Sequence, residues 1–306
     1  MDTTLLIAQV VNGVQLGLLL FLIAAGLTLV FGIMDLVNLA HGAFYMLGAF
    51  IGATVAGWTG SLLLGVLLAL PATALIALVV EVGVIHRLYR RGHLDQVLAT
   101  FGLILCFDAA TLYLWGPAGL ALALPEALAG RVGIGAVELP VWRLVIIGAG
   151  LLAAGGLWFL ITKTRIGMQI RAGASDRVMA EALGIRVGVI FSLVFALGAA
   201  LAGLAGLLIT PVTEASVGMG NDIIITAFVV IIIGGIGSVV GSFVAAIVVG
   251  LVDTLGRSFL DGLFLLVLPG EAAETAGPAV ASMLIYILMA AILAVRPAGL
   301  FPPVSR

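Results

Sequence analysis

Charged side chains are scarce in this sequence: 9% of its 306 residues are Asp, Glu, Lys or Arg, whereas 63% are hydrophobic. About a quarter of the residues of a soluble domain are charged, so this chain has too few to cover a water-exposed surface. The shortage excludes a cytosolic enzyme, a secreted domain and a disordered chain, and it makes lipid the solvent for most of the molecule. The net charge of −2 also argues against nucleic acid as a partner.

Cysteine and histidine are rare as well. The single cysteine, Cys106, excludes a disulfide framework, and three histidines argue against a dedicated metal site. The first four residues lack the positive charge that begins a signal peptide, so we predict that the apolar run after them is a retained membrane span.

Long apolar runs make up most of the chain. A helix needs about 20 apolar residues to cross roughly 30 Å of hydrocarbon, and an alternating β-barrel pattern is missing. We therefore predict an all-α polytopic membrane protein with eight or nine transmembrane spans, in one transmembrane domain over residues 1–306. The number depends on whether residues 223–255 form one broken span or two. The expected spans cover residues 5–30, 39–57, 62–85, 96–115, 142–162, 188–210, 223–234, 239–255 and 279–295.

Positive charge gathers in loops 86–95 and 163–187 and at the C-terminus, all of which the order of the spans places on one side of the membrane. Lys and Arg concentrate on the cytoplasmic side of membrane proteins. We therefore predict a multi-pass membrane protein with these loops and the C-terminus in the cytoplasm and, if the number of spans is odd, the N-terminus outside. The residues concerned are Arg87, Arg90, Arg91, Lys163, Arg165, Arg171, Arg177, Arg186, Arg296 and Arg306.

Pairs of small residues four apart recur within the predicted spans. Such pairs let helix backbones approach closely, which is how membrane helices associate without a hydrophobic driving force. Their number predicts a tightly packed bundle. The pairs are Gly13 and Gly17, Gly48 and Gly52, Ala202 and Gly206, and Gly237 and Gly241.

Polar residues inside the spans need a partner or a wet cavity, because lipid offers neither. Asp35, Asn38, Gly42 and Tyr45 follow helical spacing, with His41 beside them. One interpretation is that Asn38 and His41 hydrogen-bond across helices. The other is a helix break around Gly32 to Asp35 that exposes polar groups to a translocation route, as in transporters with discontinuous helices.

Two carboxylates complete this polar set. Glu81 lies about one turn from the end of its span, where we expect it to reach the interface or to pair with Arg87 or Arg90. Asp108 lies in mid-span and is expected to face the bundle interior, either as a structural partner or as part of a proton relay.

The loop 163–187 contains a predicted short helix. Residues 176–183 are predicted to form a short amphipathic helix, with Ser175 or Asp176 as its N-cap. Gly184 is expected to end the helix in the left-handed (αL) conformation. The segment is either a solvated connector or a docking helix that presents a few anchors to a cytoplasmic partner.

Several motifs, taken together in this order, resemble the permeases of ATP-binding-cassette (ABC) importers, and specifically the branched-chain amino acid permease family. The resemblance covers nearly the whole chain. The motifs are Val11-Asn12-Gly13, Asn38-Leu39-Ala40-His41-Gly42, Ala99-Thr100-Phe101-Gly102, Glu181-Ala182-Leu183-Gly184-Ile185, Ala199-Ala200-Leu201-Ala202-Gly203-Leu204-Ala205-Gly206, Gly234-Gly235-Ile236-Gly237-Ser238 and Arg296-Pro297-Ala298-Gly299-Leu300-Phe301. Asp35 departs from the pattern, since several relatives carry a small or apolar residue there.

The resemblance implies a type II importer bundle that moves branched-chain or other hydrophobic amino acids by alternating access. It implies a second homologous permease, two cytoplasmic ATP-binding subunits and an extracytoplasmic solute-binding protein that meets the loops near 116–141, 211–222 and 256–278. ATP and Mg²⁺ would bind the partner subunits, because this chain lacks a phosphate-binding Gly-x-x-x-x-Gly-Lys motif and is not expected to be an enzyme. Coupling to the ATPase would use Asp176, Arg177, Ala180, Glu181, Ala182 and Gly184.

Five polar residues are expected to line the substrate pathway: Asn12, Asn38, His41, Tyr45 and Thr100. Within the same family resemblance, urea or another small amide is the alternative cargo. A secondary transporter, with Asp108 and Glu81 as ion-coupling carboxylates, is the alternative mechanism. An intramembrane hydrolase built on Ser238 and His41 is a third and weaker reading, since glycine-serine strings are common in helix packing.

Overall fold

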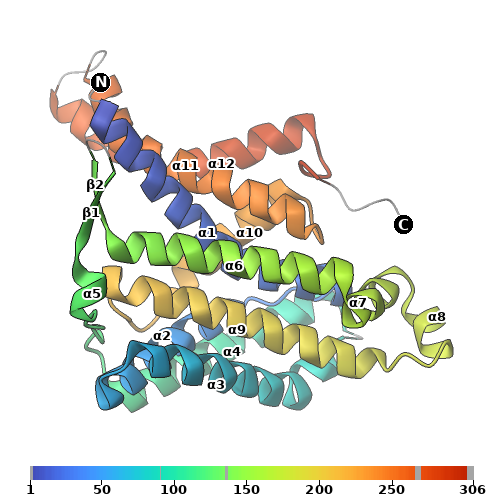
Figure 1. The fold of residues 1–306 in the computed structure, drawn as a ribbon. Helices are drawn as coiled ribbons and strands as arrows, with labels where there is room; N and C mark the ends of the chain where they lie inside the picture. Colours follow the sequence, from blue (N-terminus) through green and yellow to red (C-terminus); the bar gives the residue numbers. More distant parts are fainter. Residues whose placement is uncertain (1–2, 90, 135–136, 266–269, 302–306) are drawn as a thin grey trace.

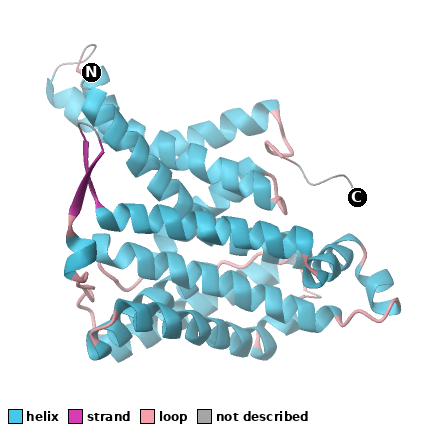
Figure 2. Cartoon of the chain, viewed as in Figure 1, coloured by secondary structure: helices cyan, strands magenta, loops and turns pink. Residues whose placement is uncertain are grey.

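The computed structural model describes residues 3–89, 91–134, 137–265 and 270–301, which form a bundle of helices with one short hairpin (Figure 1, Figure 2). Eight helices in this described part are long and apolar enough to cross a membrane, which confirms the predicted polytopic helical fold. The eight are α1 (Thr3–Met34), α2 (His41–Thr59), α3 (Leu62–Gly83), α4 (His93–Trp115), α6 (Val141–Lys163), α9 (Val187–Thr213), α11 (Val239–Phe264) and α12 (Gly270–Val295).

A ninth apolar helix, α10 (Met219–Gly234), is shorter. Its 16 residues span about 24 Å at the usual rise of an α-helix, a little less than the hydrocarbon thickness. Residues 223–255 are therefore two helices, α10 and α11, joined by a turn at residues 235–238.

The remaining elements lie at the two ends of the bundle. Helices α7 (Arg165–Ser175) and α8 (Arg177–Ala182) form one end, here called the α8 end, and the last turn of α12 lies on the same side (Figure 1). At the opposite end, here called the hairpin end, β1 (Arg131–Ile134) pairs antiparallel with β2 (Val137–Pro140), next to α5 (Glu126–Ala129) and the start of α1. The described chain thus starts at the hairpin end and finishes at the α8 end, so the number of helices that cross the bundle is odd. Helix α10 must therefore be counted as a crossing together with the eight long helices.

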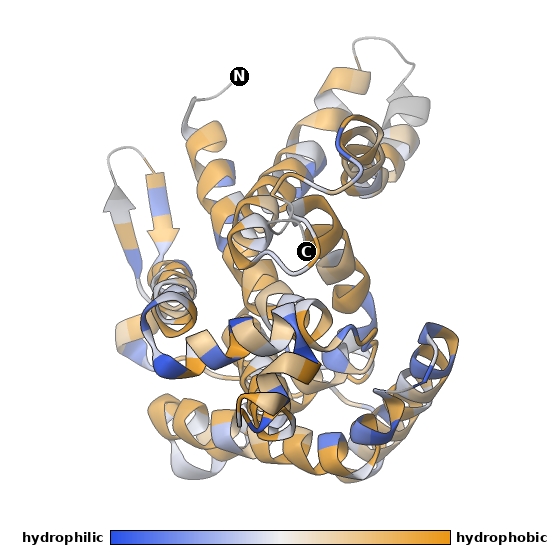
Figure 3. Cartoon of the chain, turned by 90° about the vertical axis from the view of Figure 1, so that its right-hand side faces the viewer, coloured by the Kyte–Doolittle hydropathy of each residue, from blue (hydrophilic) through white to orange (hydrophobic). Residues whose placement is uncertain are grey.

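The long helices differ sharply in burial. In the most apolar stretch of α1, 78% of the residues are buried inside the protein, whereas in that of α12 only 11% are. Helices α1, α2, α9, α10 and α11 form the inner bundle, and α3, α4, α6 and α12 lie around it. Hydrophobic residues, coloured orange in Figure 3, make up most of the long helices, as expected for helices in lipid.

Glycines hold the inner bundle together. A Cβ atom on Gly48 of α2 would overlap the backbone of Gly203 in α9, and one on Gly26 of α1 would overlap Gly198. The predicted small-residue pairs behave in the same way, since Gly13 and Gly17 both approach the backbone of α11. The sequence prediction of close helix crossings is confirmed.

Two interruptions of the helices meet inside the bundle. The first, residues 35–40, is called the α1–α2 break; it begins at Asp35, whose φ is +53°. The second is the turn at 235–238, where Gly235 and Gly237 both have positive φ. A Cβ on Gly32, in the last turn of α1, would overlap the Cα of Gly237, so the turn at 235–238 packs directly against the end of α1, next to the break.

The α1–α2 break corrects one expectation. The helical spacing from Asp35 to Tyr45 predicted one helical face, but α1 ends at Met34 and α2 begins at His41. Asp35 and Asn38 therefore lie on irregular backbone and share no helical face with Tyr45. A break was expected at Gly32 to Asp35, and it lies a few residues later.

The chain near its C-terminal end closes the turn at 235–238. The backbone N–H groups of Leu300 and Phe301 donate to the carbonyls of Ile233 and Gly234 at 2.8 and 3.0 Å. These are carbonyls at the end of α10 that have no partner within the helix, and a buried carbonyl without one would be costly. The Arg296–Phe301 motif thus has a local structural role.

Candidate functional site

Two adjoining cavities open between the inner helices at the hairpin end. They measure about 520 and 500 Å³ and share five lining residues, and together they are called the paired cavity. The first lies among α1, α2, α10, α11 and α12, and the second extends toward the end of α9 and residues 214–218. The shared residues are Leu16, Tyr45, Met219, Asp222 and Ile223.

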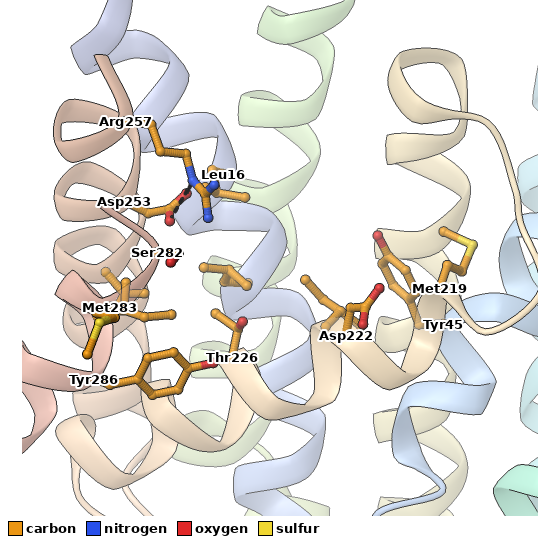
Figure 4. A pocket seen from close by; sticks show the side chains of 14 residues that line it. Leu16, Tyr45, Met219, Asp222, Thr226, Asp253, Arg257, Ser282, Met283 and Tyr286 are labelled. Carbon is orange, nitrogen blue, oxygen red and sulfur yellow. Dashed lines mark hydrogen bonds and ion pairs between the residues drawn. The ribbon is translucent and has the colours of Figure 1, made fainter. Parts of the chain in front are cut away.

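The paired cavity contains fixed charges from two different helices. On α11, the Arg257 Nε lies 3.0 Å from each carboxylate oxygen of Asp253, one helical turn away. Asp222, from the first turn of α10, lies beside Tyr45 and Met219, away from that ion pair (Figure 4). The cavity therefore carries the Asp253–Arg257 ion pair at one part of its wall and Asp222 at another, and Glu214 adds a third carboxylate to the wall of the second cavity.

The rest of the wall is mainly apolar, with a few hydroxyl groups. Apolar side chains with a small number of placed polar groups are typical of small-molecule sites. This wall and the separated charges would suit a small zwitterion with an apolar side chain. The further lining residues of the first cavity are Leu20, Thr226, Val249, Ser282, Met283, Ile285 and Tyr286.

Of the five residues expected on the pathway, Tyr45 lines the paired cavity. Asn12 lies on α1 one turn before Leu16 and outside the lining; its Nδ2 donates to Gln9 Oε1 at 3.0 Å. Its Oδ1 is buried and has no hydrogen-bond partner among the described residues.

Asn38 and His41 lie at the α1–α2 break and are fully buried. The Asn38 amide has no hydrogen-bond partner in the described part of the chain, so the bond expected from it across helices is not formed. The His41 ring interacts with the backbone of Ile23 on α1. The His41 ring faces α1, where Gly26 leaves room for it. Buried polar groups are normally satisfied, and unpaired ones call for an explanation.

Thr100 holds the backbone of the break rather than lining the cavity. Its hydroxyl lies 3.3 Å from the Leu39 N–H, which donates to it, and itself donates to the Gln96 carbonyl at 2.8 Å. One turn earlier on α4, Gln96 Oε1 accepts from the Val37 N–H at 3.1 Å. Two side chains of α4 thus satisfy backbone donors of the irregular α1–α2 break.

Glu81 is completely buried, and its partners differ from those expected. Its two carboxylate oxygens accept from the hydroxyls of Tyr89 and Ser192, each at 2.6 Å. Arg87 instead donates to the Gly83 carbonyl, and Arg90 lies outside the described residues. The expectation that Glu81 reaches the interface is wrong, because α9 and the segment after α3 enclose it.

Asp108 projects toward α10, where its Oδ2 accepts from Asn221 Nδ2 at 2.9 Å. This contact confirms that it faces the bundle, although it is only partly buried. Cys106, two residues earlier, is exposed on α4.

The predicted short helix in loop 163–187 is present as α8. Asp176 caps it, with its Oδ1 accepting from the Met179 N–H at 2.9 Å, and Gly184 ends it with φ +84°. Ala180 packs inward, and Arg177 lies over the ring of Phe191 at 4.9 Å and near Glu181 at 3.6 Å. Val178, Met179 and Leu183 stay exposed, so α8 presents a small apolar surface at one end of the bundle.

The residues that line the cavity with charge were not singled out from the sequence. Asp253 and Arg257 are an acid and a base four apart inside an apolar run, a pattern that favours a paired, inward position. Asp222 and Gln96 gave no signal of this kind, because their roles depend on segments that are distant in sequence.

The chain matches a known protein family over most of its length. The family described as the branched-chain amino acid transport system permease component matches residues 9–293. The chain is 31% identical over 263 residues to the high-affinity branched-chain amino acid transport system permease protein BraD of Pseudomonas aeruginosa, over 81% of this chain and 85% of that protein. It is 29% identical to the corresponding protein LivH of Escherichia coli K12, over 83% of this chain and 86% of that one.

A more distant relative has a different printed substrate. The chain is 28% identical to the ribose import permease protein RbsC of Escherichia coli K12, over 76% of this chain and 72% of that protein. No solved structure matches this chain.

Proposed function

This chain belongs to the family of branched-chain amino acid transport permeases, and from that membership we propose that it is the permease subunit of an ABC importer for hydrophobic amino acids. The observation that carries the proposal is the family match over residues 9–293, which includes every long helix at least in part. The conclusion fits a multi-pass membrane protein that contributes a route and leaves nucleotide chemistry to other subunits.

The proposed assembly contains this chain, a second homologous permease, two ATP-binding subunits and a solute-binding protein. The exposed apolar residues of α8 support docking of an ATP-binding subunit there, with Asp176 and Gly184 fixing the helix that carries them. Since α8 would then face the cytoplasm, the hairpin end would face the outside of a prokaryotic plasma membrane and receive the binding protein. ATP and Mg²⁺ would be held by the partner subunits.

We place the outer part of the substrate route in the paired cavity. A branched-chain amino acid at neutral pH carries an ammonium, a carboxylate and an apolar side chain. Asp222 would attract the ammonium, Arg257 the carboxylate, and the apolar wall would accept the side chain. The charges lie in a partly open cavity, which favours weak binding and ready release.

The inner part of the route would pass the α1–α2 break. Irregular backbone at membrane depth is tolerated where it is buried in protein or lines a cavity. The unpaired amide of Asn38 and the ring of His41 would meet water or the substrate polar groups when the inner helices rearrange. Asn12, Asn38, His41, Tyr45 and Thr100 stay our proposed pathway residues, with Thr100 acting on the backbone of the break.

Reconstitution tests the proposal. We expect proteoliposomes with the chain, its second permease and the ATP-binding subunits to take up labelled leucine when binding protein is added outside and ATP is inside. The chain alone should not move leucine. Uptake driven by an ion gradient without ATP would contradict the ABC mechanism and favour a secondary transporter.

A competition arm tests the cargo in the same vesicles. Excess unlabelled valine or isoleucine should abolish leucine uptake, whereas urea and ribose should leave it unchanged. Uptake of labelled urea or ribose, with none of leucine, would overturn the amino acid assignment while leaving the transport mechanism in place.

A further inference from the structure

A continuous set of side-chain contacts joins α8 to the α1–α2 break, although about 140 residues separate them along the chain and the route passes through two other helices. We propose that this set of contacts, with Glu81, Tyr89 and Gln96 at its centre, is the link through which movement of α8 repositions the break. The inference rests on the proposed function, since it assumes that α8 is moved by an ATP-binding subunit.

The first contact lies between α8 and α9. The Arg177 guanidinium lies 4.9 Å from the centroid of the Phe191 ring, in a cation–π arrangement. Gly173 of α7 lies beside Phe191, since a Cβ added there would meet the ring at ordinary van der Waals distance. A displacement of α7 and α8 therefore pushes on the first turn of α9 through Phe191.

The second contact joins α9 to the segment after α3. The Tyr89 ring packs edge-on against Phe191 at 5.9 Å between centroids. The Tyr89 hydroxyl donates to Glu81 at 2.6 Å, and the Ser192 hydroxyl, next to Phe191, donates to the other carboxylate oxygen at 2.6 Å. Burial, together with the bond to Glu81, raises the pKa of Tyr89, so the phenol remains a donor at neutral pH.

The buried carboxylate makes this junction stiff. Glu81 is fully buried, and an ionised carboxylate away from water is costly unless hydrogen bonds satisfy it. If α3, α9 or the segment between α3 and α4 that carries Tyr89 moved alone, one Glu81 carboxylate oxygen would lose its hydrogen-bond donor. The His86 Nδ1 lies 3.5 Å from the carboxylate oxygen that Tyr89 also bonds. The three elements are therefore expected to shift together.

The third contact carries the link to the break. Gln96 Nε2 donates to the carbonyls of Leu88 and Arg91 at 3.3 and 3.2 Å, on either side of Tyr89. Its Oε1 accepts from the Val37 N–H at 3.1 Å, inside the break. His93 Nδ1 also lies 3.4 Å from this oxygen. Gln96 is buried, so one amide holds both the Tyr89 segment and the break in place.

The arrangement gives each residue a positioning role, since none of them lines the paired cavity. It also explains why a buried glutamine and a buried glutamate occur in helices whose other faces are exposed to lipid. Coupling between distant sites is carried by such packed and hydrogen-bonded networks only when the joined elements have two arrangements, so the test must measure coupling rather than stability.

The test compares two variants in the reconstituted complex with binding protein. Gln96→Met removes the bonds of this amide to Val37, Leu88 and Arg91 and its contact with His93, at nearly equal volume. Tyr89→Phe removes one hydroxyl but keeps the ring contact with Phe191. We expect binding-protein-stimulated ATP hydrolysis to persist in both while leucine imported per ATP falls by roughly three- to tenfold, the range that coupled networks support. Tyr113→Phe is the matched control, because Tyr113 lies exposed on the outer face of α4.

The double variant adds a second criterion. If both residues act in one link, Gln96→Met combined with Tyr89→Phe should lose little more coupling than the worse single variant. Additive losses would overturn the single link. An unchanged uptake per ATP, including a case in which uptake and hydrolysis fall in proportion, would also overturn the link. This outcome counts for variants whose complex with the ATP-binding subunits is intact by size-exclusion chromatography.

The wild-type complex separates the two hypotheses. If it shows no ATP-driven uptake, the proposed function fails and the link fails with it. If it transports leucine and both variants keep its uptake per ATP, only the link is overturned.

Discussion

The inner helices and the peripheral helices are similarly apolar, yet the protein uses them in different ways. Helices α1, α2, α9, α10 and α11 meet through glycines at backbone distance, and their interruptions and cavity are the polar features of the interior. Helices α3, α4, α6 and α12 touch this bundle with one face and leave the other to lipid. In a membrane, burial therefore depends on which residues permit close backbone approach, because lipid and protein accept apolar side chains almost equally.

The largest expected effect distinguishes a glycine of each region. Gly48→Ala puts a methyl group into the backbone of Gly203, which cannot move aside, so we expect a loss of about 3 kcal/mol or more of stability. Gly155→Ala on α6 meets nothing within 4 Å and should be neutral or stabilising by about 0.5–1 kcal/mol. Thermal unfolding of both variants in detergent measures the difference, and equal effects would contradict the division into two regions.

The next effect concerns loop 163–187, which joins peripheral α6 to inner α9. Gly184→Pro forces a negative φ where the chain has +84°, so α8 should lose its C-terminal stop while the membrane helices stay folded. We expect leucine uptake to fall at least about 30-fold, the equivalent of roughly 2 kcal/mol. Glu181→Arg, which breaks the pair with Arg177, should act in the same direction but less. Normal uptake in both variants, with normal insertion, would disprove the docking role of α8.

Asn38→Leu sharpens the comparison within the inner bundle. The amide is buried without partners, so replacing it with an apolar side chain of similar size should leave stability unchanged or raise it. Uptake should nevertheless fall by about tenfold if the break is part of the route, a change of about 1.4 kcal/mol. Binding of the ATP-binding subunits, measured by co-purification, should remain. A parallel loss of binding and uptake would instead indicate a folding defect.

The smallest effect tests the charges of the paired cavity. Asp222→Asn removes the carboxylate that would attract the ammonium group and should reduce uptake about three- to tenfold, as expected for a charge exposed in high dielectric. The loss should appear mainly as a higher apparent KM for the loaded binding protein. Asp108→Asn, on peripheral α4 and bonded to Asn221, is the matched control and should change uptake less. A larger loss at Asp108 would place the route elsewhere.

Much of the fold could be predicted from the sequence. The long spans were located to within a few residues, except at the hairpin ends of α11 and α12, because each apolar run must cross the membrane as a helix. The stop at Gly184 and the cap at Asp176 were also predictable, since both depend on residues within four positions. Helical spacing failed from Asp35 to Tyr45, where backbone contacts from Gln96 and Thr100 support an interruption.

The candidate site was less predictable. The family resemblance indicated Tyr45, and the structure places it in the paired cavity. Asp222, Asp253 and Arg257 were missed, because each reads as a charge near a span end and only the crossing of α10, α11 and α12 brings them to one cavity. The partners of Glu81 were assigned to nearby arginines, whereas Ser192 lies 111 residues away in the chain.

By itself the sequence determined that this protein resides in lipid, that eight or nine helices cross it and roughly where each long helix lies, because each of these depends on the transfer of a single segment from water. The tertiary structure alone decided which helices lie inside, which polar groups meet and which charges share a cavity. Those outcomes depend on pairs of backbones approaching at glycines that are far apart in the chain, and the hydropathy of either segment is the same whether or not the pair forms.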